Sequence, residues 1–155
     1  MSKSITEVTG FKELQKQIGR LGNDRLKRNE MLKILRQSSK ATLQAARSEV
    51  PVSKKEHLIS GKRTRRVIQP GNLRKSIGNI TGKSKVIPTI YVGPRVKGKQ
   101  LGFYGAFVHG GTIKGIKPNP YLTRAYNKTK GQVTAEAEKG VAKYVQKQIN
   151  KLSNA

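Results

Sequence analysis

One stretch of the sequence, residues 102–125, restricts the fold more than any other because glycine and proline interrupt it at fixed places. It opens with three of the eight aromatic residues of the chain, spaced to fit one face of a short helical turn or a strand entering a bend. Paired glycines then permit positive φ and end that element. A proline follows where a helix can begin, because the N–H that proline lacks would be unpaired there.

We call residues 102–125 the central segment and predict in it an aromatic turn, a glycine break, an extended basic loop and the start of a long helix. Nothing in this segment has a catalytic pattern. The residues that we expect to hold the central segment to the sheet, or to a neighbouring subunit, are Phe103, Tyr104, Phe107, Gly110, Gly111, Pro120 and Tyr121.

The composition favours one domain with a small core. A chain of 155 residues is long enough to bury about 70% of its unfolded surface. Apolar residues make up only 34%, and there is no Trp or Cys, which excludes a disulfide scaffold and Cys-ligated metal. No apolar run approaches the roughly 18 residues of a membrane span, and the first residues lack the apolar core of a secretion signal. We therefore expect neither a membrane segment nor export by that route.

The charge is extreme and unevenly distributed. The chain has 33 Lys and Arg against 8 Asp and Glu, a net charge of +25. Self-repulsion at this level favours an anionic partner, whether nucleic acid, an acidic protein surface or an anionic membrane. From His57 to Ala135 there are sixteen Lys and Arg and no acid. Solvated surfaces normally mix both signs, so we expect one uniformly positive face that contacts anions.

Helical patterns lie at both ends of the chain. Residues 10–21 carry an apolar stripe (Phe11, Leu14, Ile18, Leu21) with helical spacing. A second helical pattern runs over residues 24–49 and ends before Pro51, since the residue before proline is pushed out of the helical region. Residues 121–152 predict a long helix, and its Gly131 and Gly140 favour a kink.

Between these helices the sequence predicts β-structure. Residues 57–59 and 65–68, within the basic stretch 52–70, fit either a hairpin or a mobile basic arm. Residues 71–77 resemble a turn leading into a strand. Residues 85–93 are rich in β-branched side chains and predict the clearest strand, in which Pro88 indicates an edge or a bulge.

The motifs that suggest catalysis are weak. Gly82-Lys83-Ser84 lacks the earlier glycine of a phosphate-binding loop, since position 77 is Ile. The two histidines, His57 and His109, have no clustered carboxylates in the sequence and make a poor metal site. A nuclease built on His109 with Lys and Arg is chemically conceivable, but a structural hydrogen-bonding histidine is the commoner role. We predict no enzyme activity, no cofactor and no metal.

Five short motifs, taken in order, resemble the neck or tail-completion protein family of long-tailed bacteriophages. The motifs are Gly10-Phe-Lys-Glu-Leu14, a helix ending at Pro51, Gly71-Asn-Leu-Arg-Lys-Ser-Ile77, Tyr104-Gly-Ala-Phe-Val-His-Gly-Gly-Thr112 and Pro120-Tyr-Leu-Thr-Arg-Ala125. Two features depart from the family pattern. His109 stands where the family usually has Glu, and residues 54–70 form a basic insertion.

The resemblance implies a single α+β domain over residues 1–155. Two N-terminal helices and a long C-terminal helix would pack on a small antiparallel sheet, with residues 54–70 as a basic loop or hairpin. It also implies a non-enzymatic virion protein that forms a six-fold ring at the head–tail junction after assembly in the host cytoplasm. Its partners would be further copies of itself, adjacent neck proteins, the tail tube or terminator, and packaged DNA.

The positive face would then meet phosphate or acidic neighbouring rings. The residues that we expect to contact nucleic acid or a partner are Lys62, Arg63, Arg65, Arg66, Arg95, Lys97, Lys99, Lys114 and Lys117. The alternative function is a sequence-nonspecific nucleic-acid-binding protein associated with the nucleoid or the ribosome, which would contact phosphate without reading bases. A basic nuclease is a weaker third alternative.

Overall fold

A computed structural model describes residues 25–60, 65–96, 101–113 and 115–153. The predicted helix over residues 10–21 lies outside them. The described elements, in chain order, are α2 (Arg25–Ser38), α3 (Lys40–Glu49), β1 (His57–Ser60), β2 (Arg65–Ile68), α4 (Asn72–Ser76), β3 (Ile77–Thr81), β4 (Ile90–Pro94), α5 (Gly105–Gly110) and α6 (Tyr121–Ser153). Both strand pairs are antiparallel two-stranded sheets, and the α+β class is confirmed.

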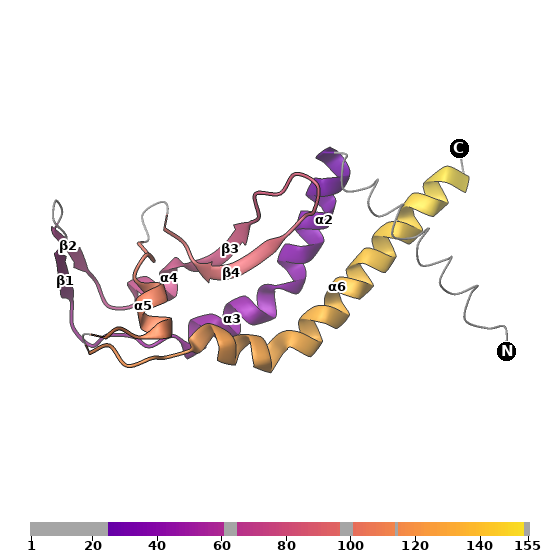
Figure 1. Ribbon diagram of the computed structural model, residues 1–155. Helices are drawn as coiled ribbons and strands as arrows, with labels where there is room; N and C mark the ends of the chain where they lie inside the picture. The colour runs from indigo at the N-terminus through magenta and orange to yellow at the C-terminus, as the bar shows by residue number, and fades with distance from the viewer. Residues whose placement is uncertain (1–24, 61–64, 97–100, 114, 154–155) are drawn as a thin grey trace.

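The helical pattern over residues 24–49 forms two helices rather than one. At the junction the Ser38 hydroxyl donates to the Ile34 carbonyl, and the Ser39 hydroxyl donates to the Arg36 carbonyl. Serine side chains that bond to the preceding turn bend helices, and Figure 1 shows α2 and α3 running in different directions. The predicted end before Pro51 is confirmed, because Val50 has extended backbone angles.

The long helix α6 packs along both α3 and α2. Near its start, Thr129 Oγ1 lies 2.7 Å from Thr42 Oγ1 of α3. Further along, a Cβ added to Gly140 would lie 2.5 Å from Cγ2 of Ile34 in α2. Gly140 therefore allows the two helices to approach closely. Figure 1 shows one unbroken helix whose direction changes in its first third, so that it follows the bend between α3 and α2.

The strand predicted over residues 85–93 is wrong in its first half. β4 begins only at Ile90, and residues 82–89 form the turn that joins β3 to β4. The Ile87 N–H bonds to the Ser84 hydroxyl, and the side chains of Val86 and Ile87 are exposed. Pro88 has no N–H for a ladder. The β-branched residues therefore belong to a turn held by Ser84.

Of the two interpretations of residues 52–70, a hairpin or a mobile arm, the structure shows the hairpin. β1 pairs with β2 from His57 opposite Ile68 to Ser60 opposite Arg65, and Figure 1 shows the pair projecting from one end of the molecule. Its base joins the remaining fold. Ile68 is 2% exposed, and the His57 ring packs edge-on against Tyr104 at 6.2 Å between centroids. The end of the basic insertion is therefore part of the core.

The core lies where the two halves of the chain meet. Its fully buried members come from α3 and its C-terminal cap, from α4 with the start of β3, and from the first turn of α6. They are Ala46, Val50, Leu73, Ile77, Tyr121 and Ala125. Tyr104 and Val108 of the central segment pack against this cluster. This cluster is small, and further buried residues lie at the hairpin base (Ile68) and where α2 and α6 run together (Leu32 and Tyr144).

Candidate functional site

The central segment forms a short helix and a tight turn beside the core. Of the three aromatic residues, Phe107 lies in α5, Tyr104 is its N-cap residue and Phe103 precedes it, in agreement with the helical one of the two sequence interpretations. The glycine pair ends α5 as predicted, since Gly110 is its last residue and the C-cap residue Gly111 has positive φ, at 77°. The Asn119 N–H bonds to the Val108 carbonyl at 3.0 Å, which closes the loop. Helix α6 then starts at Tyr121, directly after Pro120, as predicted.

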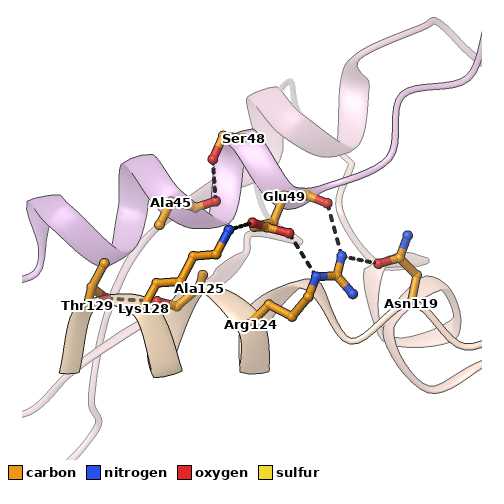
Figure 2. A network of polar contacts seen from close by, with 8 residues as sticks. All are labelled: Ala45, Ser48, Glu49, Asn119, Arg124, Ala125, Lys128 and Thr129. Atoms are coloured by element: carbon orange, nitrogen blue, oxygen red, sulfur yellow. Dashed lines mark hydrogen bonds and ion pairs between the residues drawn. The ribbon is translucent and has the colours of Figure 1, made fainter.

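A charged cluster fixes the start of α6 to the end of α3. Arg124 donates from Nε to Glu49 Oε2 at 2.8 Å and from a guanidinium nitrogen to Asn119 Oδ1 at 2.6 Å. Lys128 Nζ donates to the other carboxylate oxygen of Glu49 (Figure 2). The Glu49 side chain is only 18% exposed. These hydrogen bonds, that of Lys128 first and that of Arg124 next, lower the pKa of Glu49 below its ordinary value of 4.5.

We expect Glu49→Gln to lower the stability of the protein at pH 7 and to lose this effect in acid. A carboxyl whose pKa is lowered by folding contributes stability above its unfolded pKa, and that contribution disappears as the pH falls through the folded pKa. Urea unfolding of both proteins between pH 7 and pH 3 measures the difference. Glu138→Gln, on the exposed side of α6, is the control. An equal loss for Glu49→Gln at both ends of the pH range would contradict the assignment.

A pocket of about 540 Å³ opens between α5 and the base of the hairpin. Its apolar walls are Val52, Leu73, Phe103, Tyr104, Phe107 and Ile116. The described residues that line it include no Asp, Glu, Lys or Arg. Phe107 is 53% exposed and Ile116 47% exposed. Two of the aromatic residues expected to hold the central segment, Phe103 and Phe107, therefore face an open apolar hollow, whereas Tyr104 and Tyr121 contact the core.

His109 has the contacts of a structural side chain. Its ring packs edge-on against Tyr121 at 5.4 Å between centroids, and Nε2 lies 3.5 Å from the Thr123 hydroxyl. The described residues contain no group of three or more His, Cys, Asp or Glu that would suit a metal ion. Within the same part of the chain, no helix has the length and apolarity to cross a membrane.

The structure describes four of the nine predicted contact residues. Arg65 and Arg66 are exposed on β2, and Lys117 is exposed in the loop before α6. Arg95 is exposed but folds back over the β3–β4 pair, where its Nε donates to the Ser76 carbonyl at 3.3 Å. The remaining predicted contact residues lie outside the described part of the chain: Lys62, Arg63, Lys97, Lys99 and Lys114.

The acid-free stretch of the sequence is not free of acids in space. Glu49 contacts two of its sixteen cations, Arg124 and Lys128. Glu56 accepts a hydrogen bond from the Gln69 amide at the base of the hairpin, at 3.0 Å. Both carboxylates precede the stretch in the sequence, and the fold brings them into contact with its residues. The positive character is therefore reduced at the core and at the hairpin base, while Arg65 and Arg66 of β2 remain exposed.

Some residues that organise this region have no distinguishing sequence pattern. Asn72 donates from Nδ2 to the Leu101 carbonyl at 2.8 Å and to the Tyr104 hydroxyl at 3.2 Å. Arg47 donates to the Ile77 carbonyl at 2.9 Å. Asn72 follows the positive-φ Gly71. It occupies the unspecified position of the Gly-x-Leu-Arg motif, so the motif marks the region but not this residue. Arg47 resembles any exposed helix arginine.

No family model, curated protein or solved structure matches this chain.

Proposed function

We propose that this protein is a subunit of the head–tail connector of a long-tailed bacteriophage, where it forms a ring between the head and the tail. The observation that supports this most strongly concerns the family-like motifs. Four of the five lie within the described residues, and their apolar positions meet in one core. Apolar positions that recur in the motifs of a family are expected to form its core.

The convergence involves each described motif. Leu73 and Ile77 of the Gly-x-Leu-Arg-x-Ser-Ile motif are 4% and 0% exposed. Tyr121 and Ala125 of the motif that opens α6 are both 0% exposed. Tyr104 and Val108 of the central segment pack against them. Val50, directly before the proline that ends α3, completes the same cluster.

The shape and charge of the subunit fit a position in a ring around DNA. A projecting hairpin suits contact with a neighbouring ring or with DNA, and its β2 strand presents Arg65 and Arg66 to solvent. A net charge of +25 per subunit would repel other copies strongly unless phosphate neutralised it. Packaged DNA at the head–tail junction would supply that phosphate.

A second candidate, a sequence-nonspecific nucleic-acid-binding protein acting outside any particle, is favoured by the same charge. The two candidates differ in the bound species. The connector subunit would occupy DNA as a closed ring of fixed stoichiometry, whereas the second candidate would coat it as monomers. Sedimentation of the protein with a short duplex distinguishes these outcomes. Monomers at all concentrations would favour the second candidate.

Arg65→Gln with Arg66→Gln tests whether the hairpin contacts phosphate. The slope of log K against log salt is negative, and each lost phosphate contact makes it shallower by about 0.9. The double variant should therefore make it shallower by about 1.8. Titration of duplex DNA at several salt concentrations gives the slope. The matched control is Lys139→Gln with Lys143→Gln, two exposed cations of α6. An equal fall in the control would contradict a role for the hairpin.

A further inference from the structure

The apolar pocket beside α5 has an open face. Phe103, Phe107, Val52 and Ile116 line it and remain between 36% and 53% exposed. Its volume of about 540 Å³ lies within the range of sites that enclose several apolar groups. Exposed apolar residues gathered around one hollow mark an interaction site more often than isolated ones do.

The chain itself contains a segment with the matching pattern. Phe11, Leu14, Ile18 and Leu21 repeat at intervals of three, four and three residues. An amphipathic helix that lies in an apolar groove uses anchors with this spacing. Residues 10–21 carry three cations and one acid, a small part of the total charge, so this segment adds little to the repulsion between copies.

The segment cannot place all four of its apolar anchors in the pocket of its own subunit as one helix. Leu21 and Arg25, the first residue of α2, are four positions apart, and four Cα–Cα steps span at most about 14 Å. The pocket begins beyond the other end of α3, at Pro51 and Val52. The axes of α2 and α3 are about 21 Å and 15 Å long, so even a right-angle bend would leave about 26 Å between their far ends.

The segment precedes α2 in the sequence, and the pocket lies beside α5. Figure 1 shows α2 starting at the end remote from α5 and the hairpin. Where each subunit makes a contact between segment and pocket to one neighbour and receives it from another, the contact is heterologous, and repeated copies close into a ring or continue as a filament. Two copies that exchange the contact reciprocally would instead stop at a dimer, so ladders of linked chains distinguish the ring or filament from the dimer.

We propose that residues 10–21 of one copy bind as a helix in the apolar pocket of the next copy. The contact would place Phe11, Leu14, Ile18 and Leu21 against Phe103, Phe107 and Ile116. The occupant is a second copy of this chain, and the contact is the one that joins subunits head to tail. That this contact closes a connector ring rests on the proposed function; the pairing of segment and pocket does not.

Cross-linking tests the pairing, because the natural chain has no cysteine. The full-length variants Leu14→Cys and Phe107→Cys are purified separately, mixed in about 0.5 M salt to screen repulsion, and oxidised. We expect a disulfide-linked heterodimer from the mixture and ladders of linked chains from the double variant. The control mixture pairs Leu14→Cys with Ile87→Cys, an exposed apolar residue of the β3–β4 turn, and should remain unlinked.

A second measurement uses Phe107→Asp, a change at a half-exposed position that the fold should tolerate. Sedimentation equilibrium should show subunit association at least about 10-fold weaker, with Ile87→Asp within about 3-fold of the natural chain. An internal disulfide in the double variant, without linkage in the mixture, would show that the segment binds its own subunit and overturn the proposal. No linkage in the test mixture, or equal linkage in the control mixture, would overturn it too. Rings that form without this disulfide linkage would contradict the pairing of segment and pocket but not the proposed connector function.

Discussion

Tyr121→Ala should lower the free energy of unfolding by about 3–5 kcal/mol, the cost of removing a large buried aromatic side chain. Tyr121 is fully buried at the point where α3, α4 and α6 meet. It also carries the edge contact with His109. A small core leaves few other residues to fill the space. Urea denaturation followed by far-ultraviolet circular dichroism measures the loss.

Tyr121→Phe is the control for that variant, because it keeps the ring and removes only a weak hydrogen bond from the hydroxyl to the Gly105 carbonyl, at 3.4 Å. We expect it to cost about 1 kcal/mol or less at pH 7. Burial raises the pKa of Tyr121 to about 12, so the natural protein should lose stability between about pH 10 and pH 12, where only the unfolded phenol ionises. Tyr121→Phe should lack this part of the loss. A cost for Tyr121→Ala no larger than that for Tyr121→Phe would contradict the central role of the ring.

Gly111→Ala should destabilise the protein by roughly 2–4 kcal/mol. Gly111 has φ of 77°, and an added Cβ would lie 2.8 Å from both the Ile116 carbonyl oxygen and Pro118 Cγ. Backbone strain and overlap therefore act at the same position, and the carbonyl cannot rotate away as a side chain can. Thermal unfolding of the two proteins at the same pH measures the difference.

Gly110→Ala is the matched control at the neighbouring residue. It lies within α5 without positive φ, and an added Cβ meets nothing within 4 Å. Alanine is favoured over glycine in helices by up to about 1 kcal/mol, so this variant should be as stable as the natural protein or more stable. Equal destabilisation by both substitutions would contradict the account of the turn.

The elements that were predicted correctly are those whose signals are local. Pro51 ends α3 and Pro120 precedes α6 because proline restricts its immediate neighbours. The hairpin follows from two short β-rich segments. The first half of the strand predicted over residues 85–93 was wrong because β-branched residues also occur in turns, and the hydrogen bond between Ser84 and Ile87 leaves no periodic pattern in the sequence. The bend at Ser39 depends on side-chain bonds to the backbone that helical periodicity does not record.

The candidate site was predicted less well, because its contacts join distant residues. Glu49 and Lys128 are 79 positions apart, and nothing near either residue indicates the pair. The apolar pocket combines the chain after α3, the hairpin base and α5, so no single stretch of sequence contains its pattern. The charge distribution led to the expectation of one uniformly positive face, yet the fold returns Glu49 and Glu56 to the acid-free stretch.

Cryo-electron microscopy of tailed particles purified from the source of this chain would test the proposed connector function most directly. The account predicts a closed ring of copies at the junction between head and tail, with the β1–β2 hairpins directed toward DNA or the adjacent ring and the long α6 helices visible in each subunit. Particles that lack the chain, or carry it away from that junction, would contradict the account.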